Sequence, residues 1–315
     1  MTTDSDILPV ERTTSPLLIV LLGPTGVGKT AVSISLAKHF NAPVVSSDSR
    51  QIYRELPIGT AAPTQSEQAD IPHYFIATHS ITESYSAGQY ELDAIQLLEG
   101  KLFSSNSVVV LSGGSMMYVD AVCNGLDNIP TINEEIRSYW QNQYAEKGLA
   151  YLQQELQKLD PVHYQELDLQ NYKRVLHALE VCTQTGQPFS ALRTGVKKER
   201  SFRILKIGLN RPRAELYERI NLRVEQMMAL GLLEEAKAVF PHRHLNSLNT
   251  VGYKELFEYL DGKWSLEFAV QMIQQNSRRY AKRQLTWYRR DADIHWFHPD
   301  EVSSILKLIE ETRML

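Results

Sequence analysis

The sequence predicts an α/β fold in which helices cover both faces of a mostly parallel sheet. Short apolar runs alternate with stretches of helical periodicity, a pattern typical of such a sheet. That alternation stops between about residues 126 and 203, where apolar residues recur only at helical spacing. A glycine-rich turn also joins the first apolar run to the first helical stretch. We therefore expect one α/β core that is interrupted by a helical insertion domain.

The strands of the core are predicted from the short apolar runs. In chain order these runs occupy residues 17–23, 42–48, 73–79, 107–114, 203–210 and 294–297. From Pro212 onward the chain is helix-rich almost to its end. We expect the core domain to comprise residues 17–125 and 204–315, and the insertion domain to comprise residues 126–203. Residues 1–16 are predicted to form a flexible N-terminal tail.

Composition narrows the classes of protein to consider. The 315 residues include 33 basic and 37 acidic side chains, with a formal charge of −4, so a local basic patch must hold any polyanionic partner. The apolar run at residues 17–23 is far too short to cross a bilayer, and no secretory signal precedes it. Cys123 and Cys182 lack metal-binding or redox spacing. We expect a cytoplasmic protein with free thiols and no membrane association.

The strongest motif is GPTGVGKT, which runs from Gly23 to Thr30 between a predicted strand and a predicted helix. Its glycines let backbone amides turn inward around a phosphate, and the helix N-terminus adds its dipole. Lys29 supplies a positive charge to the phosphate oxygens, and Thr30 offers a hydroxyl to Mg²⁺. The motif predicts a P-loop NTPase-like core that binds a polyphosphate, which need not be ATP.

A carboxylate follows the second predicted strand. A P-loop protein that hydrolyses nucleotides usually carries a second acid that helps to hold magnesium, yet the run VVVLSGG ends in Ser112, Gly113 and Gly114. Asp48 is then the first free carboxylate at the carboxyl edge of the sheet, where open α/β folds bind ligands. One interpretation gives Asp48 a role in the chemistry. The other makes it a turn residue whose oxygens are satisfied by nearby amides.

A basic segment lies near the C-terminus. SRRYAKRQLTWYRR places Arg279, Lys282, Arg283 and Arg290 near one face of a helix, with aromatic residues between them. Such a helix can bind RNA phosphates while its aromatic rings stack on unpaired bases. The alternative is a solvated basic face above core aromatics. The insertion adds a weaker basic cluster in NYKRVLHALE, residues 171–180.

Taken in order, these motifs resemble those of a known family, the bacterial tRNA dimethylallyltransferases. The resemblance runs from about residue 17 to 297. It is carried by GPTGVGKT, VVSSDSRQIYRELPIGTAAP, YSAGQYELDA, LSGGSMMYVDAVCNGLDNIP, NYKRVLHALEV, LYERINLRVEQMMALGLLEEA, TVGYKELFEYLDG and RRYAKRQLTWYRRD. The resemblance implies transfer of a five-carbon prenyl group from dimethylallyl diphosphate to the exocyclic amine of the adenosine beside the tRNA anticodon. It also implies Mg²⁺ as cofactor, the anticodon stem-loop of tRNA as partner and no obligate protein partner.

The resemblance assigns roles residue by residue. Asp48 matches the general base for the target amine, Thr25 a threonine near the reacting diphosphate, and Arg223 an arginine that stabilises the leaving group. The implied diphosphate loop comprises Gly23, Pro24, Thr25, Gly26, Val27, Gly28, Lys29 and Thr30, with Thr30 as the metal ligand. The implied tRNA contacts are Asp48, Ser49, Arg50, Gln51, Ser115, Arg137, Lys173, Arg174, Val175, Leu176 and His177, to which the basic helix adds Arg279 and Arg283.

Two positions depart from the family pattern, and two other functions compete with it. Ala62 replaces the lysine of the usual GTAKP, and His177 stands where an arginine is common.

A P-loop kinase for small molecules would explain GPTGVGKT and Asp48, but it would leave the basic C-terminal helix unexplained. An RNA-binding NTPase would explain that helix, but it requires the second acid that is missing after VVVLS. A prenyltransferase accounts for both features.

Overall fold

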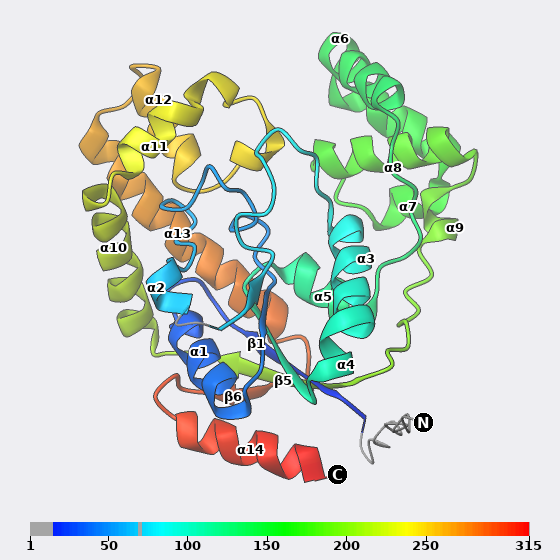
Figure 1. Ribbon diagram of the computed structural model, residues 1–315. Helices are drawn as coiled ribbons and strands as arrows, with labels where there is room; N and C mark the ends of the chain where they lie inside the picture. The colour runs from blue at the N-terminus through cyan, green and yellow to red at the C-terminus, as the bar shows by residue number, and fades with distance from the viewer. Residues whose placement is uncertain (1–14, 69–70, 315) are drawn as a thin grey trace, which may run out of the picture. The chain divides into compact units, whose positions relative to one another are not determined.

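A computed structural model describes residues 15–68 and 71–314, which form two compact units (Figure 1). Of the described residues, the first unit contains 15–68, 71–123 and 199–314. The second unit is the continuous segment Asn124–Lys198. The sequence placed the insertion at residues 126–203, whereas residue 203 is the first residue of a core strand. Residues 1–14 of the predicted tail lie outside the described residues.

The first unit is built on a six-stranded parallel sheet, as predicted. Its strand order is β3-β2-β4-β1-β5-β6, and each neighbouring pair is parallel. The strands are β1 Leu17–Leu22, β2 Val44–Ser46, β3 His73–Tyr74, β4 Val108–Gly113, β5 Arg203–Leu209 and β6 His295–Phe297. Because the sheet is parallel, all its carboxyl ends meet along one edge, which positions the loops after β1, β2 and β4 beside one another.

The third predicted strand was too long. We expected it to cover residues 73–79, but only His73 and Tyr74 pair with β2. Phe75 and Ala77 have φ values of 61° and 52°, in the left-handed region that a β-strand cannot contain. The backbone therefore leaves the sheet after two residues.

Helices cover both faces of the sheet, as predicted. Alternate residues of β1 point to opposite sides, and each set packs in a separate apolar cluster. One face is covered by α1 Lys29–Phe40, α10 Arg213–Ala229 and α14 Val302–Met314 (Figure 1). The other is covered by α3 Ala87–Leu97, a π-helical turn at Leu98–Leu102, α4 Phe103–Ser105 and α5 Met116–Asn124.

A third apolar cluster lies in the C-terminal part of the same unit. It joins the loop after β2 to α11 Leu232–Val239, α12 Tyr253–Leu260 and the first half of α13 Leu266–Tyr288. The remaining short elements of this unit are α2 Gln65–Gln68 and the 3₁₀ turns Phe240–His242 and Asn246–Leu248. Helix α13 contributes buried residues to all three clusters: Ala269 and Ile273 to the third, Ala281 to the first and Tyr288 to the second.

The second unit is helical, with its own apolar core. It contains α6 Glu134–Leu159, which is kinked at Gly148, α7 Pro161–Glu166, α8 Tyr172–Thr185 and α9 Phe189–Leu192. Helix α8 is amphipathic, and its buried side packs on α6. The buried carboxylate of Asp160 caps α7 through the His163 amide at 2.9 Å and binds the amide and hydroxyl of Ser190. This network accounts for Asp160 as a structural residue.

Candidate active site at the carboxyl edge of the sheet

The predicted phosphate loop joins β1 to α1. Gly26 and Gly28 have φ values of 80° and 109°, which side chains disfavour and which let the loop curl. Lys29 Nζ donates to the carbonyl oxygens of Gly23 at 2.9 Å and Pro24 at 3.0 Å. Removal of this ammonium from solvent lowers the pKa of Lys29 to about 8, although the nearby Asp48 carboxylate opposes the shift. The ammonium therefore lies within the curl of the loop.

Helix α13 fixes the loop to the sheet. The side chain of Gln284 is almost fully buried, and its carboxamide oxygen accepts a hydrogen bond from the Thr25 amide at 2.9 Å. Its Nε2 donates to the carbonyl oxygen of Gly114 at 2.7 Å. One side chain thus joins the loop after β1 to the loop after β4. The sequence analysis missed Gln284, because a glutamine within a basic helix carries no distinguishing local signal.

Asp48 combines the two interpretations that its sequence left open. Its Oδ1 accepts hydrogen bonds from the amides of Arg50 at 2.9 Å and Gln51 at 3.3 Å, so it does form a local turn. Within the described residues, Oδ2 has no hydrogen-bond partner, and Asp48 lines a cavity. The turn holds the carboxylate in place while leaving one oxygen for a ligand.

The cavity next to Asp48 has a volume of about 280 Å³ and lies entirely within the first unit. Seven of the residues predicted from the sequence line it: Thr25, Asp48, Ser49, Arg50, Ser115, Arg223 and Arg283. The structure thereby brings together the loop after β1, the loop after β2, the end of β4 and two C-terminal helices. Gln51 and Arg279 are not part of the lining. The side-chain Nε2 of Gln51 instead donates to the carbonyl oxygens of Thr60 and Ala61, and Arg279 is exposed.

Arg223 is a half-buried cation in the lining of this cavity. Desolvation lowers its pKa, and the attraction of the Asp48 carboxylate partly restores it. Two more arginines hold the phosphate loop from outside: Nε of Arg219 donates to the Gly26 carbonyl oxygen at 3.1 Å, and Nε of Arg211 donates to that of Val27 at 2.9 Å. The sequence analysis missed both, because their contacts with the loop form only in the folded chain.

Hydrogen bonds fix the predicted tRNA-contact loop. Ser115 Oγ accepts from the Ser49 amide at 2.7 Å and donates to Ser49 Oγ at 3.0 Å. Farther along the loop, the Glu235 carboxylate accepts from the amides of Ile58 and Gly59 and from the Tyr253 hydroxyl. The loop is therefore preorganised at both ends.

Further lining residues had no predicted role. The segment Asn249–Gly252 and Lys254 also line the cavity, and Tyr280 joins them from α13. TVGYKE was visible as a motif in the sequence, but without a chemical signal that indicated a function. Burial raises the pKa of Tyr280 to about 12, so its hydroxyl stays protonated at neutral pH.

The basic C-terminal helix does not present one continuous basic face. Arg283 lines the cavity of Asp48, whereas Lys282 lines a different cavity. Tyr288 is buried in the core, and Trp287 Nε1 donates to Asp120 at 2.9 Å. Arg290 follows the end of α13 and lies 3.8 Å over the Trp287 ring. The alternative of core aromatics is therefore correct for Tyr288. Trp287 is partly buried against the same apolar cluster, and its indole N–H is bound by Asp120.

The remaining predicted tRNA contacts belong to the second unit. Lys173, Arg174 and His177 are exposed on α8, while the side chains of Val175 and Leu176 are buried in that unit's core. Arg137 lies within ion-pair distance of two glutamates, at 3.6 Å from Glu134 and 3.9 Å from Glu180. Only the exposed members of this group have side chains available to a polyanion.

Comparison with known proteins identifies the family. A sequence model of the family described as IPP transferase matches residues 51–291. The chain belongs to the IPP transferase family. The resemblance drawn from the sequence is therefore confirmed.

Individual members of the IPP transferase family match most of the chain. It is 57% identical over 288 residues to tRNA dimethylallyltransferase 2 of Parabacteroides distasonis, covering 91% of this chain and 96% of the relative. It is 56% identical over 297 residues to tRNA dimethylallyltransferase 1 of Bacteroides fragilis, covering 94% and 98%.

Solved structures agree with this assignment. The tRNA isopentenylpyrophosphate transferase of Bacillus halodurans superposes with a TM-score of 0.67 at 36% identity, covering 93% of this chain and 95% of that one. A eukaryotic dimethylallyltransferase that acts on tRNA gives a TM-score of 0.75 at 25% identity, covering 90% and 74%. Among residues 15–68 and 71–314, we find no helix with the length and apolar character of a membrane span.

Proposed function

We propose that this chain transfers a dimethylallyl group from dimethylallyl diphosphate to the exocyclic amine of the adenosine on the 3′ side of the tRNA anticodon. The chain is a tRNA dimethylallyltransferase by family membership. The observation that carries the assignment of residues is the shared cavity of Thr25, Asp48 and Arg223. It combines a diphosphate loop, a cation and a carboxylate, which are the three groups that this reaction needs.

The diphosphate loop and its cations stabilise the leaving group. During transfer, the amine nitrogen bonds to the allylic carbon while the bond from that carbon to the diphosphate oxygen breaks. The diphosphate departs with the electron pair, so negative charge develops on the oxygen that Lys29, Arg223 and the loop amides surround. Preorganised donors of this kind supply the largest part of many rate enhancements. Thr25 lines the same cavity and is held by Gln284 through its backbone amide.

Asp48 accepts the proton that the amine loses. An adenine amine is a poor nucleophile because its lone pair is delocalised into the ring, so removal of its proton assists attack. Oδ1 is anchored by two backbone amides, which leaves Oδ2 as the basic atom.

Mg²⁺ fits the residues present at the start of α1. Within the described residues the exposed Thr30 hydroxyl has no hydrogen-bond partner, and Mg²⁺ commonly binds one protein oxygen together with substrate phosphates and water. We infer that Thr30 holds it. When bound, Mg²⁺ would neutralise part of the diphosphate charge.

The tRNA enters through its anticodon stem-loop. The target base must leave its stack to reach Asp48, which costs little in a single-stranded loop. Ser49, Arg50 and Arg283 line the cavity that would receive the base, and Tyr280 offers an aromatic ring there. We infer that the exposed Lys173 and Arg174 of the insertion bind phosphates of the stem. We propose a cytoplasmic location, where this substrate is found, and we expect no obligate protein partner.

The direct test is mass analysis of nucleosides from unmodified tRNA after incubation with the protein, Mg²⁺ and dimethylallyl diphosphate. We expect one adenosine per tRNA to gain a dimethylallyl group, with one diphosphate released for each transfer. Unmodified adenosine together with tRNA-stimulated release of phosphate from ATP would instead favour an NTPase.

Asp48→Asn should separate chemistry from donor binding. The substitution keeps the size and much of the hydrogen bonding but removes the basic oxygen, so we expect kcat to fall about 100-fold or more. Donor affinity should stay near normal. Lys29→Ala should raise KM for the donor and also slow transfer, because the charge that Lys29 neutralises is present before and after bond cleavage.

Steady-state kinetics with tRNA and labelled donor would measure both effects. Near-normal turnover by the Asp48→Asn enzyme would eliminate the general-base role. It would leave Asp48 as a turn residue that shapes the cavity.

Salt dependence tests the role of α13 in tRNA binding. Each phosphate contact that is lost should reduce the slope of log K against log salt by about 0.7 to 0.9. We expect the double variant Arg279→Ala, Arg283→Ala to lose one or two phosphate contacts and to show a correspondingly shallower slope. Filter binding of an anticodon stem-loop at several salt concentrations measures this slope. A charge-matched control pair, Lys38→Ala with Lys307→Ala on α1 and α14, should leave it unchanged. Equal slopes in both pairs would remove these arginines from the RNA interface.

A further inference from the structure

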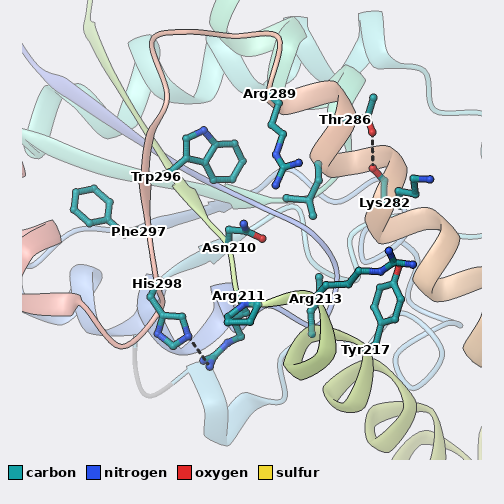
Figure 2. Close-up of a pocket in the computed structure, with 13 residues that line it drawn as sticks. Asn210, Arg211, Arg213, Tyr217, Lys282, Thr286, Arg289, Trp296, Phe297 and His298 are labelled. Atoms are coloured by element: carbon teal, nitrogen blue, oxygen red, sulfur yellow. Dashed lines mark hydrogen bonds between the residues drawn. The ribbon is translucent and has the colours of Figure 1, made fainter.

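A second, larger cavity lies in the first unit and is separate from the proposed active site. Its volume is about 610 Å³, which is within the range of small-molecule sites, and neither Asp48 nor any residue of the phosphate loop lines it. The C-terminal half of α13 forms one wall (Figure 2). The junction between β5 and α10 and the end of β6 form the others.

Three exposed cations surround this cavity without an acidic partner. Arg213 comes from the first turn of α10, while Lys282 and Arg289 come from α13 and its C-cap. Figure 2 shows the Arg213 guanidinium directed toward α13 and the Arg289 guanidinium extended from that helix toward the cavity. Within the described residues none of the three makes a side-chain ion pair; Arg213 only lies 5.0 Å over the Tyr217 ring. Three cations without an acidic partner create a local positive potential that would attract an anionic ligand.

Two further groups indicate that the ligand carries more than a phosphate. Asn210 Oδ1 is buried and has no hydrogen-bond partner in the described chain. Such an acceptor calls for a donor on the ligand. Trp296 also lines the cavity, and its indole packs directly on the β5 backbone because Gly208 has no side chain. An aromatic ring can stack on a nucleobase, and an amide oxygen can accept a hydrogen bond from one of its N–H groups.

We propose that this cavity is a binding site for a nucleoside phosphate. Arg213, Lys282 and Arg289 bind the phosphate oxygens, and Asn210 Oδ1 accepts a hydrogen bond from an amine or ring N–H of the base beside Trp296. A free nucleotide carries a phosphate and a base on one small molecule, so it can satisfy the three cations and Asn210 together; an RNA strand is the alternative that the test distinguishes. The proposal does not depend on the transfer reaction.

The cavity shares one residue with the surroundings of the phosphate loop. Arg211 lines the cavity and is neutralised by Glu215 and Asp300, while its Nε donates to the Val27 carbonyl oxygen of the loop. Arg211 therefore separates the two sites and is not counted among the free cations. Because ADP can also occupy a phosphate loop, a binding test must first disable that loop.

Equilibrium dialysis of radiolabelled ADP against the full-length Lys29→Ala protein tests the proposal. We expect one ADP per chain, with at least tenfold weaker binding when Arg213→Gln and Arg289→Gln are added. Lys282→Gln alone should weaken it as well. The control pair Lys38→Gln with Lys307→Gln, which removes the same charge elsewhere, should not. Asn210→Leu should reduce the preference for ADP over inorganic diphosphate as a competitor.

Two outcomes would overturn the proposal. One is that ADP does not bind the Lys29→Ala protein at millimolar ligand, or that it binds equally well after the arginine substitutions. For this comparison the substituted protein must have an unchanged melting temperature. The other is that these substitutions weaken binding of an anticodon stem-loop while ADP does not bind, which would make the cavity an RNA contact. Arg213→Gln with Arg289→Gln should leave the transfer rate without ADP unchanged, so the two proposals fail in different measurements.

Discussion

The geometry of the active site depends on one buried carboxamide. Gln284 accepts from the Thr25 amide and donates to the Gly114 carbonyl oxygen, so it ties the phosphate loop to the end of β4 at the point where α13 reaches the carboxyl edge. Only a side chain with both a donor and an acceptor can satisfy these two backbone groups, and leaving either unsatisfied costs about 1–3 kcal/mol. With α13 held in this position, Tyr280, about one turn before Gln284, and Arg283, the residue before it, line the cavity of Asp48.

The same edge explains why the core lacks the acid of a nucleotide hydrolase. A Cβ on Gly113 would lie 2.3 Å from Ser47 Oγ and 2.5 Å from the Ser47 carbonyl carbon, so no larger residue fits there. A Cβ on Gly114 would meet Gln284 Nε2 at 2.5 Å. Neither Gly113 nor Gly114 can therefore be replaced by an acid, because backbone and Gln284 occupy the space of its side chain. Close approach of β2 and β4 in turn brings Asp48, the residue after Ser47, to the phosphate loop, where it interacts electrostatically with Lys29 and Arg223.

The fold and the local motifs were predictable because they depend on residues close together in sequence. The phosphate loop and the strand end that carries Asp48 follow from spacing and from the parallel sheet, whereas Ser115 was predicted through the family resemblance. Features that depend on tertiary packing were not predictable. Helical periodicity grouped Lys282 with Arg283, but the orientation of α13 sends them to different cavities. Positive φ at Phe75 and Ala77 ended β3 early, although neither residue is glycine. The loop contacts of Arg211 and Arg219 join residues almost two hundred positions apart, as their separations of 184 and 193 show.

The claim that Gln284 organises the diphosphate loop is tested most directly by calorimetric titration of Mg²⁺ and inorganic diphosphate into Gln284→Leu protein. Leucine keeps a similar volume but can satisfy neither Thr25 N–H nor the Gly114 carbonyl oxygen, so the loop loses its anchor. We expect diphosphate affinity to fall at least tenfold, which corresponds to about 1.4 kcal/mol. Gln271→Leu, on an exposed position of the same helix, should bind diphosphate normally. Unchanged diphosphate affinity in a folded Gln284→Leu protein would contradict the account.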